Sequence, residues 1–182
     1  MSVICANAVL PPTNFNFCAP KVRFGNIKRL WTTRASSADV LADWEDLAEW
    51  TTRINATAVI PVSGAAPIRA LTITGDLPEP TRTETEISDD RIVYGPYTNV
   101  LNFTVDDLSL ENIEWARLYQ DDTYIIKMWY GWSTLIAGST AGIDATIRTA
   151  LVIPRGKSEV TGINGVLTWT GIQAEVANSP FV

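Results

Sequence analysis

The sequence predicts a mainly β protein with a single domain: an antiparallel β-sandwich or barrel, one packed α-helix at about residues 38–54, and an extended N-terminal arm. Beyond residue 56, short runs of β-branched and aromatic residues alternate with Pro, Gly and Asp turns, which is typical of a chain of many short strands. Only one stretch has helical spacing. The 182 residues, which include seven Trp, are enough to bury one sizeable core.

The first 34 residues are predicted to form a basic extended arm, separate from a β-rich domain over residues 35–182. Residues 1–20 contain three Pro and read as irregular, whereas residues 21–34 are strand-like around Gly25. This arm has five basic residues and no acidic one. Because acidic residues dominate the following segment, we expect four bases to pair with a neighbouring copy: Lys21, Arg23, Lys28 and Arg29. The alternative is two solvated faces, or pairing within the chain.

The helix is predicted from capping and from hydrophobic spacing. Ser36 with Asp39 resembles a capping box, and acidic residues gather in the first turns, where the helix dipole favours them. Val40, Trp44 and Leu47 keep helical spacing.

The segment Gly75–Asp90 is the most polar part of the chain and is expected to form an acidic loop. Its TRTETEI portion alternates Thr with charged residues, so it could also be an extended, solvent-facing arm of a hairpin.

The remaining residues are assigned to strands by alternation and by β-branched and aromatic content. Expected strands are 57–62, 68–74, two within 91–105 separated by Gly95-Pro96, 113–119, 123–132, 143–153 and 165–176, with a loop at 135–142.

The composition argues against an enzyme. The chain has no His, the most common general acid or base near neutral pH. Glu84 and Glu86, with Asp89 and Asp90 nearby, could resemble a glycosidase pair, but they lie in the most polar segment rather than in a desolvating cleft. We therefore expect no catalytic residue.

No metal or other cofactor is expected either. Cys5 and Cys18 cannot complete a four-ligand zinc site by themselves and are expected to be plain thiols. Asp106 and Asp107 lack the spacing of a calcium loop. No apolar run is long enough for a membrane span, and the start of the chain lacks a secretory signal, so synthesis in the cytoplasm is expected.

The layout resembles that of a known family. Three stretches carry the likeness: VLNFTVDDLSLENIEW at 100–115, IDATIRTALVIPRGKSEVTG at 143–162 and GVLTWTGIQAEV at 165–176. Over residues 57–182 the chain resembles the tail tube proteins of tailed bacteriophages and, more broadly, phage virion structural proteins. The basic arm and the helix at 38–54 match no hallmark of that family.

The resemblance implies a homo-oligomer of stacked hexameric rings in the virion, in contact with other virion proteins. It also implies an acidic lumen through which DNA passes without specific binding, because acids repel phosphates. Four acids are the expected lumen or inter-ring contacts: Glu84, Glu86, Asp89 and Asp90.

Two alternatives stay open. The chain could have another virion role, as a capsid decoration, head-fibre or connector-ring protein anchored by residues 1–34. It could also be a carbohydrate-binding β-sandwich module that uses Trp129 and Trp132 as a stacking platform.

Overall fold

The computed structural model describes residues 25–36, 40–54, 66–88, 91–120, 124–155, 161–171 and 174–181. These residues form nine strands and two short helices, so the fold is mainly β, as predicted. In chain order the elements are β1 (Ile27–Arg34), α1 (Leu47–Ile54), β2 (Arg69–Asp76), β3 (Thr81–Ser88), β4 (Arg91–Val105), α2 (Leu110–Leu118), β5 (Ile125–Trp132), β6 (Leu135–Gly138), β7 (Ile143–Val152), β8 (Gly162–Thr170) and β9 (Glu175–Asn178).

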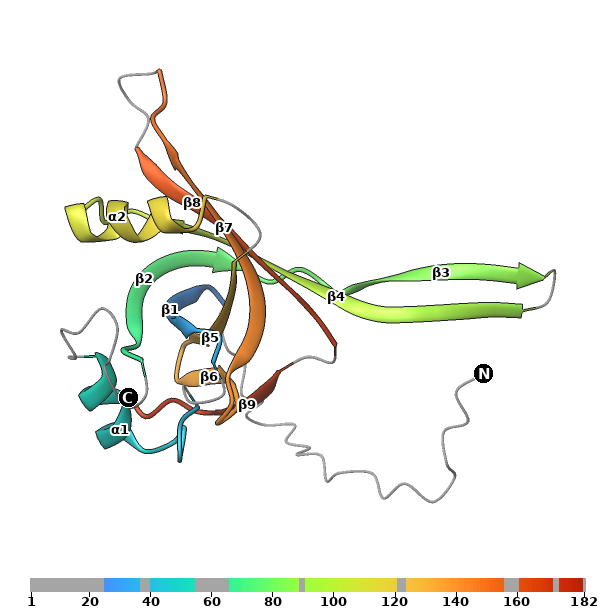
Figure 1. Cartoon of the computed structure of the whole chain (residues 1–182), viewed down its shortest axis with the longest axis horizontal. Coiled ribbons are helices and arrows are strands. Elements are labelled where there is room, and N and C mark those ends of the chain that lie inside the picture. Colours follow the sequence, from blue (N-terminus) through green and yellow to red (C-terminus); the bar gives the residue numbers. More distant parts are fainter. Residues whose placement is uncertain are drawn as a thin grey trace, which may run out of the picture.

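Six antiparallel strands close into a barrel in the order β1-β2-β4-β8-β7-β5 (Figure 1). Closure comes from the pairing of β1 with β5, which places Leu30 opposite Tyr130 and Trp31 opposite Trp129. The strands β6 and β9 continue the sheet beyond β5. Closing the barrel gives each of its strands a partner on both sides and so removes exposed sheet edges.

The barrel interior is filled by side chains that alternate along the strands. On β4 the inward residues are Leu101, Phe103 and Val105, all buried, and they meet Ile147 of β7 and Leu167 of β8 in one hydrophobic cluster. This alternation has the period of two that a half-buried strand requires.

The helix α2 packs against one end of the barrel and contributes Trp115 and Ala116 to its core. The hydroxyl of Thr149 on β7 donates a 2.6 Å hydrogen bond to the carbonyl of Ala116. A buried polar group of the barrel is thereby satisfied by the helix, which fixes the position of α2.

A second hydrophobic layer covers the outside of β1, β5 and β6. Trp50 of α1 is fully buried, with ring centroids 5.6 Å from Trp31 and 5.2 Å from Trp129, and Phe181 stacks on Trp31 at 5.0 Å. The strands β1 and β5 are therefore covered on both faces, and most of their residues are buried.

Glycine makes room for Trp129 in this layer. A Cβ at Gly138 would lie 2.3 Å from the indole of Trp129, and one at Gly142 would lie 2.9 Å from it. Gly142 also has a φ of +71°, a backbone conformation that suits glycine. The predicted loop at 135–142 is wrong in part, because residues 135–138 form strand β6 against β5.

The predicted helix at 38–54 is too long. The observed helix begins at Leu47, and residues 40–46 form turns. The backbone N–H of Ala48 donates to the carboxylate of Asp46 at 2.9 Å, and that of Glu45 donates to Asp43 at 2.9 Å. Short acidic side chains bind nearby backbone N–H groups in turns. The helix therefore begins only after Asp46, although hydrophobic spacing alone would place its start earlier.

The prediction of a strand at 113–119 is wrong: these residues belong to α2 and its C-terminal turn. Only Trp115 and Ala116 are buried, two neighbours that plug the end of the barrel, so the segment has neither the alternation of a strand nor a clear helical stripe. Glu111 in the first turn and Arg117 in the last favour the helix through its dipole.

The expected boundary after residue 34 is also wrong, since residues 27–34 form β1 inside the barrel. Residues 91–105 form one continuous strand rather than two. Pro96 is tolerated because β4 bulges here: Gly95 and Pro96 together lie opposite the single residue Thr83 of β3, and a bulge is a position where a strand accommodates proline. The strand predicted at 57–62 lies outside the described residues.

Candidate assembly interface

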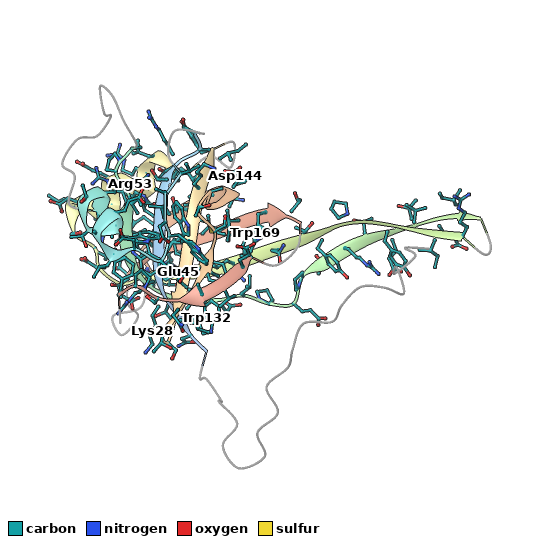
Figure 2. The ribbon with its side chains drawn as sticks, turned by 90° about the horizontal axis from the view of Figure 1, so that it is seen from below. Lys28, Glu45, Arg53, Trp132, Asp144 and Trp169 are labelled. Atoms are coloured by element: carbon teal, nitrogen blue, oxygen red, sulfur yellow. The ribbon has the colours of Figure 1, made fainter. Side chains whose placement is uncertain are left out.

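A two-stranded hairpin projects far from the barrel and is the most distinctive surface of the molecule (Figures 1 and 2). It consists of β3 and the first half of β4, residues 81–88 and 91–97, which we call the arm. The strand β8 joins β4 only from Thr98 onward, and β2 joins it only from Asn102. The arm thus has no third strand among the described residues. The acidic loop expected at 75–90 is wrong for residues 81–88, which form β3, and the alternative of a solvent-facing hairpin is confirmed.

The arm has two chemically different faces. Directly opposed residues share a face, so Glu84 lies beside Tyr94 and Glu86 beside Ile92. We call this the charged face. Between Thr83 and Val93 the intervening residues form the neutral face, on which Thr85 lies opposite Val93; Arg91 lies beyond it, where β3 bulges near the tip.

The charged face carries a cation–π contact. The guanidinium carbon of Arg82 lies 3.7 Å from the centre of the Tyr94 ring and 5.2 Å from that of Tyr97. Such a contact at an exposed site contributes only about 0.5–1 kcal/mol. It links the two strands near the base of the arm, but it does not replace a hydrophobic core.

The arm exposes an unusual amount of apolar side chain for a solvated hairpin. Five large residues are 43–61% exposed, namely Ile87, Ile92, Val93, Tyr94 and Tyr97. A lone two-stranded hairpin is only marginally stable in water. These residues are distributed over both faces of the arm, and exposed apolar surface of this extent is typical of an interaction site.

The structure locates four of the eight predicted contact residues. Glu84 and Glu86 lie on the charged face of the arm and form no ion pair with another described residue. Lys28 and Arg29 lie on β1, exposed at the surface of the barrel. The other four predicted residues, Lys21, Arg23, Asp89 and Asp90, lie outside the described part of the chain. Sequence reasoning missed Ile92 and Tyr94, although they alternate along 91–94 as Glu84 and Glu86 do along β3.

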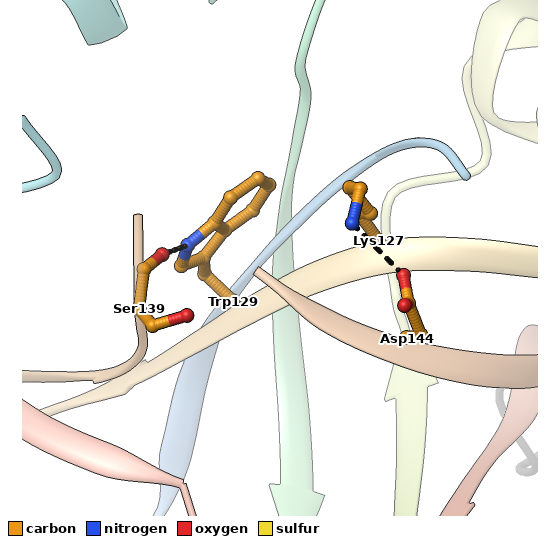
Figure 3. A network of polar contacts seen from close by, with 4 residues as sticks. All are labelled: Lys127, Trp129, Ser139 and Asp144. Carbon is orange, nitrogen blue, oxygen red and sulfur yellow. Dashed lines mark hydrogen bonds and ion pairs between the residues drawn. The ribbon is translucent and has the colours of Figure 1, made fainter. Parts of the chain in front are cut away.

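A buried lysine is the best candidate for reactive chemistry, and its contacts are structural. Lys127 is 7% exposed, and its ammonium lies 3.0 Å from the carboxylate of Asp144, directly across from it on β7 (Figure 3). The pair stabilises the junction of β5 and β7. Asp144 lines a groove of about 390 Å³ together with Ser139 and Glu175, but Lys127 is not among the residues that line it.

Trp129 cannot be a stacking platform. It is fully buried, and its indole N–H donates a 2.7 Å hydrogen bond to the carbonyl of Ser139 (Figure 3). Its partner in that hypothesis, Trp132, stacks on Tyr130 with ring centroids 5.8 Å apart.

Both Tyr130 and Trp132 line a groove of about 410 Å³ where β1 begins and β2 and β5 end, with Asp76 as its charged residue. Burial raises the pKa of the Tyr130 phenol to about 12, so this hydroxyl stays protonated near neutral pH. The groove therefore offers an aromatic wall but no base from that tyrosine.

Within the described ranges, no three metal-ligating side chains cluster in a way that could hold an ion. In the same ranges, neither helix has the length and apolar character needed to cross a membrane.

Comparison of the chain with models of known protein families, with curated proteins and with solved structures found no match. The function must therefore be argued from the arm and the barrel themselves.

Proposed function

We propose that this chain is a virion structural protein that assembles into stacked, hexameric rings and forms a phage tail tube through which DNA passes. The observation that carries the proposal is the arm: a long hairpin without a core, whose exposed side chains include Tyr94 and Ile92. A neighbouring copy would supply the missing cover. Ring-forming contacts between different patches of identical chains suit such a projecting element.

The charge distribution supports the same assembly. The chain has a formal net charge of −6, so acidic side chains that face a lumen would repel the phosphates of a passing duplex, while Glu84 and Glu86 on the arm are placed for contact between copies. Lys28 and Arg29 are exposed on the barrel, where they can meet acidic residues of another copy. On this proposal the protein catalyses no reaction and needs no cofactor.

Another virion role, in a head or connector, would also use the arm as a contact. In that case residues upstream of the barrel would be the anchor. A truncation that tests this anchor must remove no more than residues 1–24, because removal of residues 25–34 would also delete barrel strand β1.

Removing the arm is the decisive test of assembly. Thr81 and Thr98 are directly opposed, so residues 82–97 can be replaced by Asn-Gly, a two-residue turn that suits a hairpin. We expect the full chain to form rings or tubes in negative-stain images and a large species in light scattering. The shortened chain should keep the circular dichroism spectrum of the barrel but elute as a monomer.

Two results would overturn this proposal. One is a full chain that stays monomeric at several hundred micromolar. The other is a shortened chain that assembles as well as the full chain does.

A further inference from the structure

One side of the barrel is left without the second layer that covers the other. On β1 and β5 the outward residues Trp31 and Trp129 lie beneath α1 and Phe181. On β4, β8 and β7 the outward residues are partly or fully exposed. We call these the outer face: Val100, Asn102, Thr104, Thr146, Arg148, Ala150, Asn164, Val166 and Thr168.

Among these nine residues Arg148 is the one charged side chain, and Asp144, which is also outward on β7, is paired with Lys127 of β5. The residues of the outer face form rows across the three strands, and the central row joins Asn102 to Val166 and Val166 to Arg148. Arg148 is exposed and forms no ion pair with any other described residue. The rest of the face is Thr, Asn, Val and Ala, an unusually neutral surface on an acidic chain. A shallow groove of about 520 Å³ runs over β7 and β8 and is lined by Arg148 and Val166.

The charged face of the arm has complementary features. It presents two carboxylates without an ion pair among the described residues, Glu84 and Glu86, beside the exposed side chains of Tyr94 and Ile92. The cation of this face, Arg82, lies nearer the base of the arm, over the Tyr94 ring. Carboxylates that flank apolar side chains match a neutral sheet with one central guanidinium, and a guanidinium can bind a carboxylate through two parallel hydrogen bonds.

The arm cannot reach the outer face of its own chain. β4 runs without a break from the arm into the barrel wall, so the arm points away from the barrel in both views (Figures 1 and 2). The complementary surfaces can therefore meet only between two copies.

We propose that the charged face of the arm of one copy docks across the outer face of a second copy, with Glu84 and Glu86 around Arg148 and Ile92 and Tyr94 over Val166. This contact rests on the proposed function and deepens it by naming the partner surface. The contact is heterologous, since arm and outer face are different patches, so it leads to rings or stacks rather than closed pairs.

Charge reversal at each side tests the docking. We expect Arg148→Glu, and separately Glu84→Lys with Glu86→Lys, to raise the concentration for half-assembly at least tenfold. In the triple variant that combines all three changes, the concentration for half-assembly should return to within about threefold of that of the natural chain. The charges of the two surfaces are then exchanged and attract each other again.

Matched controls sit close to each change. Thr83→Lys with Thr85→Lys places the same lysines on the neutral face of the arm, one residue away along β3. Arg117→Glu makes the same charge change as Arg148→Glu at an exposed position of α2. Both controls should assemble within about threefold of the natural chain.

A crosslink tests proximity directly. In a background with Cys5→Ser and Cys18→Ser, Glu84→Cys chains are mixed with Arg148→Cys chains and oxidised. We expect a disulfide-linked mixed dimer, and far less product when Thr85→Cys replaces Glu84→Cys.

The outcomes separate the two proposals. If the natural chain assembles and loss of the arm abolishes assembly, while Arg148→Glu assembles like Arg117→Glu and no crosslink forms, the docking surface is wrong and the proposed function stands. If the natural chain never leaves the monomer, both are wrong.

Discussion

The two halves of strand β4 lie in different environments: the first half is in the exposed arm and the second half is in the barrel wall. From Arg91 to Tyr97 nearly every residue is exposed, whereas from Asn99 to Val105 every second residue is buried. In the barrel β4 has partners on both edges, whereas in the arm β3 is its one partner among the described residues. The barrel half is satisfied within one chain. The arm half is not satisfied among the described residues, which is why we propose that a second copy of the chain covers it.

The difference teaches where stability and function are separable. A closed barrel with two hydrophobic layers does not depend on a hairpin that shares no core with it. Substitutions in the two hydrophobic layers should therefore change folding, whereas substitutions on the arm should change assembly. The following expectations run from the largest effect to the smallest.

The largest effect is expected at Trp129, which belongs to the layer outside β5. Trp129→Ala removes a fully buried indole and its hydrogen bond to Ser139, and a loss of this kind costs about 3–5 kcal/mol of the free energy of unfolding. Urea denaturation followed by tryptophan fluorescence measures the cost. Tyr94→Ala on the arm is the comparison. Equal losses for the two variants would show that the arm and barrel are not energetically separate.

A smaller and asymmetric effect is expected at the pair of Lys127 and Asp144. Asp144→Asn leaves the ammonium of Lys127 buried without its carboxylate, and we expect a loss of about 1 kcal/mol, because 65% of the Asp144 side chain is exposed and water screens the pair. Lys127→Met removes the buried charge itself, so its cost should be close to zero.

Thermal and urea unfolding of both variants checks the sign of this difference. A Lys127→Met variant that loses more stability than Asp144→Asn would contradict the view that the pair merely compensates for a buried charge.

The arm could be predicted from the sequence because its signal is local. Thr alternates with charged residues along TRTETEIS, and a strand of β-branched and aromatic residues follows at once, so both strands of the hairpin lie within one window. Alternation likewise predicts the strand at 143–153; its residues Ala145, Ile147 and Thr149 are buried, whereas Leu151 and Ile153 of the same alternating series are exposed.

The barrel's closure could not be predicted, because it depends on partners far apart in the sequence. Nothing near Trp31 in the sequence indicates that it lies directly opposite Trp129 on the neighbouring strand β5. The identity of α2 depends on an open barrel end that Trp115 fills, which is again a property of the assembled fold. The outer face was missed for the same reason: Arg148 becomes a lone charge only when β4 and β8 lie beside β7.

The smallest effect on folding is expected at the cation–π contact of the arm. Arg82→Gln removes the guanidinium from the rings of Tyr94 and Tyr97 but touches no residue of either hydrophobic layer, so the free energy of global unfolding should change by less than about 0.5 kcal/mol. The local effect should be larger than the global one, since a hairpin held by few contacts opens by itself. We expect amide hydrogen exchange to accelerate severalfold at Glu84 and Tyr94, while amides such as those of Leu101 and Leu167 in the barrel stay unchanged. Exchange that accelerates equally in the barrel would mean that the arm supports the fold, and the separation of stability from assembly within β4 would fail.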